Sequence, residues 1–234
     1  MYRLTNVIKQ YERRGESVIA FQCDHLEIKR GEYVAVVGPS GSGKTTLLSL
    51  LGGMLSPSSG EVCLDDQSLY ELPVYERSRI RREKMGFVFQ SFNLVPYLTA
   101  LENVQVPLFL TGMPSGEQRA LAAAMLERFG LGQRLDHKPA ELSVGQQQRV
   151  ALARTLVNDP TTILADEPTG NLDPENRQLV LDMLAECRAA GRTVVMVTHD
   201  TAAAKLAGRR LILREGQVLE EAADTERILA SAAA

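Results

Sequence analysis

The stretch GPSGSGKT, Gly38 to Thr45, constrains the fold of this chain more than any other. It fits the pattern G-x-x-x-x-G-K-[ST] and directly follows YVAVV, Tyr33–Val37, whose apolar residues predict a buried strand. A helical pattern over Lys44–Leu51 comes after it. The glycines of the stretch leave room for backbone N–H groups to wrap a phosphate, where a Cβ would obstruct the turn. Strand, glycine loop and helix together predict an α/β fold built around a phosphate site.

The loop and the helix behind it contain the residue types that hold a nucleoside triphosphate. We expect Lys44 to reach the β- and γ-phosphates, and the hydroxyl of Thr45 to bind Mg²⁺. Thr46 is a candidate contact to the α-phosphate, and the positive end of the helix dipole supports these contacts. The other loop residues expected to hold the nucleotide are Gly38, Pro39, Ser40, Gly41, Ser42 and Gly43.

A pair of acids follows a second apolar run. Thr161–Ala165 reads TTILA and leads into Asp166 and Glu167. Ligands of open α/β sheets bind at the carboxyl ends of the strands, so both acids are expected to face the phosphate site. Asp166 is then a partner of Mg²⁺, and Glu167 is placed to orient or deprotonate an attacking water. A protein that only binds nucleotide has little use for Glu167, so the pair predicts hydrolysis.

Two further polar residues end predicted strands at the same edge. His199 follows Thr193–Val197 (TVVMV), and Gln90 follows Gly86–Phe89. We expect His199 to reach the γ-phosphate or the attacking water, and Gln90 to contact Mg²⁺ or that water. A purely structural His199 is the alternative, because a single histidine is more often structural.

A second helix N-terminus, within LSVGQQQR at residues 142–149, is also suited to an anion. The segment Ser143–Gln146, with Gly145 inside it, offers a hydroxyl and free backbone amides at the start of a predicted helix, Gln146–Val157. The chain already holds one nucleotide on its own loop. A second cradle is useful if it closes over a nucleotide held by another copy, so we expect two subunits, head to tail, to bury two nucleotides between them.

Composition excludes several classes of protein. The 234 residues are 44% hydrophobic and carry a net charge of −3, which argues against a dedicated nucleic-acid binder. The N-terminus lacks the apolar run of a signal peptide, and no stretch approaches the length of a membrane span. Three cysteines lie far apart and are expected as small buried thiols in a reducing cytosol: Cys23, Cys63 and Cys187.

Patterns along the chain predict a single domain, 1–234, with two parts. Residues 1–30 alternate between polar and apolar, which indicates an antiparallel edge sheet before the first buried strand. Residues 91–160 become helical, with glycine and proline between the segments, which indicates a helical lobe inserted into the core. Residues 1–90 and 161–234 are then the α/β core with its antiparallel strands.

With these motifs the chain resembles the nucleotide-binding subunit of an ABC transporter nearly end to end. GPSGSGKT is similar to the family's Walker A motif, ILADEP to its Walker B with the following glutamate, and LSVGQ to its LSGGQ signature. Gln90 matches the Q-loop, Asn171-Leu172-Asp173 the D-loop, and His199 the H-loop. The resemblance implies a RecA-like P-loop NTPase core with a mostly parallel sheet, and ATP hydrolysis in a homodimer.

The resemblance also implies further nucleotide contacts and marks one departure. Tyr11 falls where the family places an aromatic that stacks on adenine, and the chain lacks the NKxD-type element that reads guanine, which implies ATP. Asp173 is implied at the shared site together with Ser143, Gly145 and Gln146. Val144 stands where the family usually has glycine. Valine is strained if this position needs a positive φ and tolerated if the position is already helical.

Three strings narrow the resemblance to the branch for lipoprotein release, macrolide efflux and cell division: ADEPTGNLD, LLGGMLSPSSGEV and FNLVPYLTALENVQVPL. That branch implies a separate membrane subunit, a bacterial source and a peripheral place on the cytoplasmic face of the cell membrane. The process powered is then export, lipoprotein extraction or force transmission. A cell-division scaffold with slow turnover is the alternative. DNA-maintenance and translation ATPases are disfavoured, because the chain has no long coiled-coil insertion and no second cassette.

Two surfaces are candidates for contact with the membrane subunit or the membrane. Gln90–Pro107 is rich in apolar residues and is the expected dock for a cytoplasmic helix of the partner, unless these residues form the core of the lobe. Arg77–Lys84 (RSRIRREK) is either a solvated helix face or a contact to anionic lipid headgroups.

Overall fold

The computed structural model describes residues 1–13, 15–170 and 172–221. Its strands are β1 (Tyr2–Arg13), β2 (Glu16–Ile28), β3 (Tyr33–Val37), β4 (Ser59–Leu64), β5 (Gln67–Ser68), β6 (Met85–Phe89), β7 (Thr162–Asp166), β8 (Thr193–Val197), β9 (Arg209–Arg214) and β10 (Gln217–Glu221). Its helices are α1 (Lys44–Leu51), α2 (Val74–Lys84), α3 (Ala100–Gln105), α4 (Ser115–Arg128), α5 (Val144–Leu156), α6 (Pro174–Ala189) and α7 (Thr201–Ala204), with 3-10 turns η1 (Val106–Leu108), η2 (Gly132–Arg134) and η3 (Pro139–Glu141). In the described part of the chain, no helix has the length and apolar character needed to cross a bilayer.

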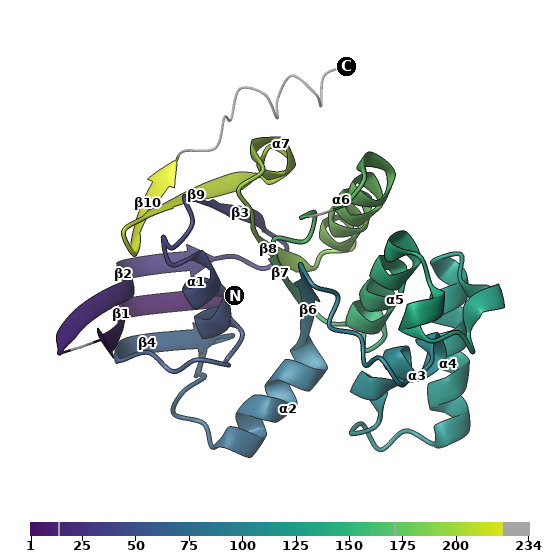
Figure 1. Cartoon of the computed structure of the whole chain (residues 1–234). Helices are drawn as coiled ribbons and strands as arrows, with labels where there is room; N and C mark the ends of the chain where they lie inside the picture. The colour runs from purple at the N-terminus through teal and green to yellow at the C-terminus, as the bar shows by residue number, and fades with distance from the viewer. Residues whose placement is uncertain (14, 171, 222–234) are drawn as a thin grey trace.

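Among the described residues ten strands form one sheet, in the order β5-β4-β1-β2-β10-β9-β3-β8-β7-β6. The half from β9 to β6 is parallel, with β3 between β9 and β8, and β7 between β8 and β6. Helices cover both faces of this half: α1 belongs to one apolar core and α6 to the other (Figure 1). All five residues of β8 are therefore buried. The parallel pairing brings the carboxyl ends of β3, β6, β7 and β8 to one edge.

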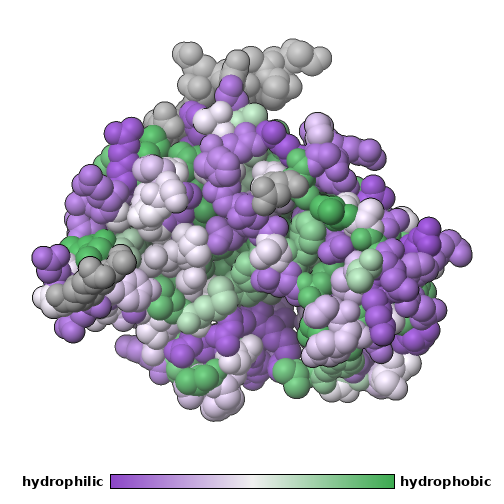
Figure 2. All heavy atoms as spheres, in the orientation of Figure 1, coloured by the Kyte–Doolittle hydropathy of each residue, from purple (hydrophilic) through white to green (hydrophobic). Residues whose placement is uncertain are grey.

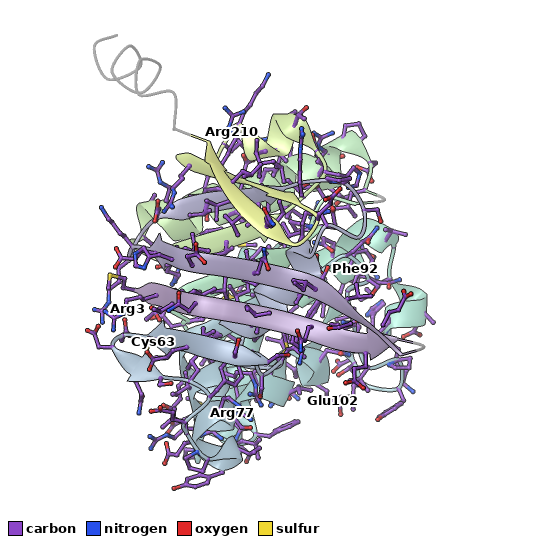
Figure 3. The ribbon with its side chains drawn as sticks, turned by 90° about the vertical axis from the view of Figure 1, so that its left-hand side faces the viewer. Arg3, Cys63, Arg77, Phe92, Glu102 and Arg210 are labelled. Atoms are coloured by element: carbon purple, nitrogen blue, oxygen red, sulfur yellow. The ribbon has the colours of Figure 1, made fainter. Side chains whose placement is uncertain are left out.

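The other half of the sheet is antiparallel. β1 and β2 pair from Tyr2↔Ile28 to Arg13↔Glu16, and β4 pairs along the other side of β1; these strands lie side by side in Figure 3. The predicted α/β fold with an antiparallel part is confirmed, but residues 1–30 do not form its edge. β4 and β5 lie outside β1, because the chain returns to the sheet after α1.

Two strands near the C-terminal end were not predicted from the sequence. β9 and β10 stand between β2 and β3 and join the antiparallel half to the parallel half. Their hairpin turns at Glu215 and Gly216, which both have a positive φ, 49° and 78°. Arginines at Arg209, Arg210 and Arg214 break the apolar pattern of β9, which hid the strand from the sequence patterns.

Most predicted elements have bounds close to the observed ones. β3, α1 and β8 start and end where predicted, and β7 runs one residue later, so that Asp166 is its last residue. α5 begins at Val144, two residues earlier than predicted, because Ser143 caps it. All three cysteines are free, with Cys63 and Cys187 buried and Cys23 half-buried.

Helices α3, α4 and α5 pack around a third apolar core, which lies beyond β6, the edge strand of the sheet (Figure 1). α5 connects this core to the sheet. Val150 and Ala153 point into the core of the helices, whereas Leu152 and Leu156 belong to the core that contains α6. Residues 91–160 are thus joined to the parallel strands through one face of α5.

A buried asparagine shapes the segment that leads into α3. The side chain of Asn103 is fully buried; its Oδ1 accepts from the Val95 N–H at 2.8 Å, and its Nδ2 donates to the carbonyls of Val95, Leu98 and Thr99 at 3.1, 3.1 and 2.9 Å. Thr99 in turn caps α3 in a capping box with Glu102. The segment between β6 and α3 is therefore held to the helices although it has no regular secondary structure.

Candidate active site

The predicted phosphate loop connects β3 to α1 and is packed tightly between backbone segments. Gly43 is the N-cap of α1 with φ 98°, and a Cβ there would lie 2.2 Å from the carbonyl oxygen of Ala20 on β2. A Cβ on Gly38 would lie 2.2 Å from the carbonyl oxygen of Leu213 on β9. Both positions need glycine, because the obstacles are backbone atoms. The missed strand β9 and strand β2 therefore hold the loop in place.

The side chain of Lys44 reaches back to the first two residues of the loop. Its Nζ donates to the carbonyls of Gly38 and Pro39, at 2.9 Å each, so the ammonium group is held by neutral oxygens. Ser42 is 3% exposed, and its hydroxyl has no hydrogen-bond partner among the described residues. Backbone amides, a lysine and an unpaired hydroxyl in one loop suit a phosphate chain.

A pocket of about 400 Å³ opens beside this loop and collects most of the predicted residues. Its lining comes from the loop and α1, from the ends of β6, β7 and β8, and from β2: Ala20, Ser40, Gly41, Gly43, Lys44, Thr45, Thr46, Gln90, Asp166, Glu167, Val197 and His199. Gly38, Pro39 and Ser42 shape the loop without lining the pocket. The strand ends thus meet at the phosphate loop, as the sequence predicts.

Asp166 and Thr45 form the oxygen pair expected to bind Mg²⁺. The Thr45 hydroxyl donates to Asp166 Oδ1 at 3.5 Å. Burial raises the pKa of Asp166, and the neighbouring charge of Glu167 raises it further, against the opposing effects of Thr45 and Lys44. A cation would offset the cost of this half-buried charge. A hydroxyl and a carboxylate fit Mg²⁺, which keeps its remaining positions for phosphate and water oxygens.

Glu167 has an unusual backbone and a histidine partner. Its φ is +46°, in the left-handed region that is uncommon for residues other than glycine, and its N–H donates to Val197 O at 2.9 Å. Its Oε2 lies 2.9 Å from Nδ1 of His199 and accepts from the His199 backbone N–H at 3.3 Å. The strained backbone aims a mostly buried carboxylate at the pocket, next to an exposed imidazole.

Gln90 lines the pocket, whereas Tyr11 does not. Gln90 follows β6 and packs against the loop after Glu167, where a Cβ on Gly170 would lie 2.8 Å from its Nε2. Tyr11 is 45% exposed on β1, with the ammonium of Lys9 5.0 Å from its ring centre, and it is not among the residues that line the pocket. Its predicted contact with adenine stays a prediction.

The second predicted cradle lies apart from this pocket. Ser143 caps α5: its hydroxyl accepts from Gln146 N–H at 3.3 Å, and Gln146 Oε1 accepts from Ser143 N–H at 3.0 Å. None of Ser143, Gly145 and Gln146 lines the pocket beside the phosphate loop. Val144 is the first helical residue and is not among the residues with positive φ, so valine is tolerated here.

Asp173 and a residue missed by the sequence patterns, Asn176, lie beside the start of α5. Asp173 caps α6. Its carboxylate accepts hydrogen bonds from the backbone N–H and from the side-chain amide of Asn176, and these bonds lower the pKa of Asp173. Asn176 in turn packs against Gly145, where a Cβ would lie 2.2 Å from its Oδ1. The start of α5 and the start of α6 are therefore neighbours. Asn176 could have been found as the third residue after a predicted cap. Asn171 of the D-loop lies outside the described residues.

A strand, glycine loop and helix, with a carboxylate pair at the end of another parallel strand of the same sheet, β7, define a P-loop nucleotide-binding protein. The sequence model of the ABC transporter family matches residues 21–170. This match covers more than half of the chain, and the chain belongs to the ABC transporter family.

Individual relatives agree with this assignment. The chain is 49% identical over 212 residues to the lipoprotein-releasing system ATP-binding protein LolD of Pseudomonas fluorescens, covering 90% of this chain and 93% of that protein. It is 43% identical to the macrolide export ATP-binding/permease protein MacB of Brucella melitensis over 94% of this chain, but spans 34% of that longer protein.

A solved structure shows the same fold. The chain matches the ATP-binding cassette MJ0796, of which a dimeric post-hydrolysis state bound to ADP and Pi is known, with a TM-score of 0.88 and 43% identity. The match covers 95% of this chain and 98% of the other. The relative of that name, from Methanocaldococcus jannaschii, is 46% identical over 226 residues. The predicted P-loop NTPase fold is confirmed.

Proposed function

We propose that the chain is one ATP-binding domain, with residues 91–160 as its inserted lobe, that hydrolyses ATP as a homodimer to drive a separate membrane subunit. The observation that carries this proposal is the separation of two half-sites. The phosphate loop, carboxylate pair and His199 share one pocket, whereas Ser143 and Gly145 lie outside it, beside the start of α6. A second copy can supply the missing half. The dimeric structures of the related cassette MJ0796 support this arrangement.

The residues of the pocket then have distinct roles. Lys44 and the amides of the loop bind the phosphates of ATP, and Tyr11 stacks on the adenine. Thr45, Asp166 and Gln90 would hold Mg²⁺, which supplies charge neutralisation on the phosphate oxygens when bound. Glu167 accepts a proton from the attacking water.

His199 and residues of the second copy are the remaining groups to which we give a role. His199 orients the carboxylate of Glu167, to which its Nδ1 lies close, and is placed to contact the γ-phosphate. Ser143, Gly145, Gln146 and Asp173 of the second copy close the site and exclude water. Val144 leaves this cradle helical and unstrained, so turnover and not only binding is expected; a slow scaffold subunit has no observation in its favour.

The partner is a membrane subunit that docks near Gln90 and the helices of residues 91–160. Support comes from the name of the MacB relatives, which joins an ATP-binding part to a permease, while this chain spans about a third of their length. Support also comes from exposed apolar residues in this region: Tyr97, Val106, Phe109 and Leu110. The chain then works on the cytoplasmic face of a bacterial membrane in export, lipoprotein extraction or force transmission.

The test uses the Glu167→Gln variant of the full chain. With ATP and Mg²⁺ it should lose hydrolysis and form a stable dimer in light-scattering chromatography, whereas Lys44→Ala should fail to bind nucleotide. The ATP-loaded Glu167→Gln dimer is then used as bait in detergent-solubilised native membranes. Recovery of a protein with few spans and a large outer domain supports the proposal. Unchanged turnover in Glu167→Gln, or recovery of ribosomal or DNA-associated proteins instead, contradicts it.

A further inference from the structure

The loop that carries His199 is fixed by the residue that follows it, Asp200. Asp200 caps the short helix α7: its Oδ1 accepts from the backbone N–H groups of Ala202 and Ala203, at 2.9 and 3.3 Å. The N–H of Asp200 itself donates to the hydroxyl of Thr198, a fully buried residue, at 3.0 Å. The backbone on both sides of His199 is therefore held, although the imidazole is 74% exposed.

The other carboxylate oxygen of Asp200 binds an arginine from a different helix. Oδ2 of Asp200 forms an ion pair with Nη2 of Arg177, which lies in the first turn of α6. The side chain of Arg177 is 37% exposed and that of Asp200 is 22% exposed, so the pair is partly shielded from water. In the view of Figure 2, mainly hydrophilic side chains lie where α6 and α7 reach the surface. The pair thus joins these two helices, whose apolar side chains share one core.

The turn of α6 that carries Arg177 also lies beside the second cradle. Asp173 caps this helix and is bonded to Asn176, which packs against Gly145 at the start of α5. Arg177 is the next residue, and its N–H donates to the carbonyl of Asp173 at 2.9 Å. The first turn of α6 therefore contacts the cradle and, through Arg177, the loop of His199.

A second ion pair on the same helix has no such connection. Glu186, near the other end of α6, pairs with Arg128 at 3.0 Å, and their side chains are 65% and 55% exposed. Exposed pairs of this kind add little to stability, because water screens the charges and the side chains lose freedom. If the pair of Arg177 is also a surface pair only, removal of Arg177 and removal of Glu186 should have the same small effect. A positioning role predicts a loss of turnover for Arg177 alone.

We infer that Arg177 is a positioning residue for hydrolysis: its ion pair with Asp200 holds the loop in which His199 meets Glu167. The inference rests on the proposed function, in which Glu167 is the base, and adds the residue that fixes the position of its histidine partner. Without the guanidinium group, Asp200 keeps the cap of α7 through Oδ1 but loses the contact of Oδ2, so the loop is free to turn about the cap. His199 then moves relative to Glu167, and a misplacement of about 1 Å near reacting groups lowers a rate by up to about a hundredfold.

The first test is the steady-state kinetics of ATP hydrolysis by the full chain. We expect Arg177→Gln to lower kcat by about tenfold and to leave KM for ATP within about threefold, because Arg177 does not line the nucleotide pocket. Arg177→Lys should recover most of this loss, since it keeps the charge. Asp200→Asn should lose as much as Arg177→Gln, and the double variant should lose no more than either. Glu186→Gln is the matched control, and its kcat should equal that of the wild type.

The second test follows the imidazole of His199 by NMR and needs no turnover. The chain has three histidines, so the other two serve as internal references, and His199→Ala assigns the signal. The ¹⁵N shift of Nδ1 reports its contact with Glu167. Arg177→Gln should move this signal and leave those of the other histidines in place, Arg177→Lys should return it toward the wild-type position, and Glu186→Gln should move none of them.

Three results would overturn the inference. These are a kcat of Arg177→Gln equal to that of the wild type, an equal loss of kcat in Glu186→Gln, or an unchanged Nδ1 signal of His199 in Arg177→Gln. If Arg177→Gln fails to fold, Asp200→Asn decides by the same criteria, because asparagine keeps the cap of α7. A wild type without hydrolysis would contradict the proposed function, while the His199 signal would still test the inference, so the two failures are distinct.

Discussion

His199 and Glu167 form a direct side-chain contact at the ends of neighbouring strands, with Nδ1 2.9 Å from Oε2. The backbone N–H of His199 donates to the same oxygen at 3.3 Å. The side chain of Glu167 is 19% exposed and that of His199 is 74% exposed, so the acid is the more buried of the two partners. The acid that we propose as the base is thus oriented by a residue that itself faces the nucleotide pocket.

Removal of this contact should lower turnover more than nucleotide binding. We expect His199→Ala to reduce kcat by about tenfold to a hundredfold, with the affinity for ATP nearly unchanged, because Glu167 loses its orientation. In the double variant with Glu167→Gln the losses should not add, since His199 acts through Glu167. Steady-state kinetics and nucleotide titration of the four proteins test this. Additive losses would show that His199 acts on the substrate independently.

Asp166→Asn should stabilise the fold while it removes activity. Burial raises the pKa of Asp166 above its ordinary value of 3.8. The charged carboxylate is then disfavoured in the folded state. The contribution of the protonated Asp166 to the free energy of unfolding is therefore fully present below the ordinary pKa, and it is lost as the pH rises through the raised pKa of the folded state. At neutral pH the asparagine should raise the melting temperature by a few degrees, and in mildly acidic buffer the gain should shrink. Mg²⁺ with ATP should stabilise the wild type more than the variant. A neutral or destabilising substitution at neutral pH would contradict the pKa argument.

Asn103→Ala should destabilise the chain strongly. The substitution removes four hydrogen bonds to the backbone of Val95, Leu98 and Thr99 and leaves buried groups unpaired. We expect a loss of about 3 kcal/mol in the free energy of unfolding, measured by urea denaturation. Gln105→Ala on the same helix is the matched control and should cost far less. A loss below that of the control would mean that the segment before α3 is held by other contacts.

The local parts of the nucleotide site could be predicted from the sequence because each depends on a short stretch. Tyr33–Val37, the glycine loop and Lys44–Leu51 follow one another, and their pattern specifies strand, turn and helix without help from the rest of the chain. Asp166, Glu167 and His199 could be placed together because parallel strands end at one edge.

Long-range features of the site could not be predicted in this way. Strands β9 and β10 enter the sheet beside β3 and β2 through pairing across most of the chain, and no local pattern sets their order. The backbone carbonyl of Leu213 on β9 nevertheless occupies the space that a Cβ at position 38 would need, so Gly38 is required there. The left-handed backbone of Glu167 is also invisible in the sequence, because it depends on the bond from its N–H to Val197 O.

Val144→Gly tests whether the unusual residue of the signature motif tunes turnover. Val144 is already helical and 55% exposed, so glycine relieves no strain. Glycine in a helix costs up to about 1 kcal/mol relative to ordinary residues, so the variant should be slightly less stable. We expect its ATP hydrolysis to stay within about threefold of the wild type, which corresponds to less than one kcal/mol. A much larger rise in hydrolysis would show that the valine side chain restrains closure of the dimer.

Gly145→Ala separates two reasons for the glycine at the start of α5. A Cβ at this position would lie 2.2 Å from Oδ1 of Asn176, and Asn176 cannot turn away freely because it is bonded to Asp173. The variant should therefore lose ATP-dependent dimerisation in the Glu167→Gln background, measured by light scattering, while its single-chain fold persists. If the clash with Asn176 is the cause, Asn176→Ala should restore dimerisation of Gly145→Ala. If dimerisation stays lost, the Cβ at position 145 blocks the nucleotide of the second copy directly, and the glycine is needed at the start of α5 for contact with that nucleotide. A Gly145→Ala variant that dimerises normally would contradict both readings and remove Gly145 from the shared site.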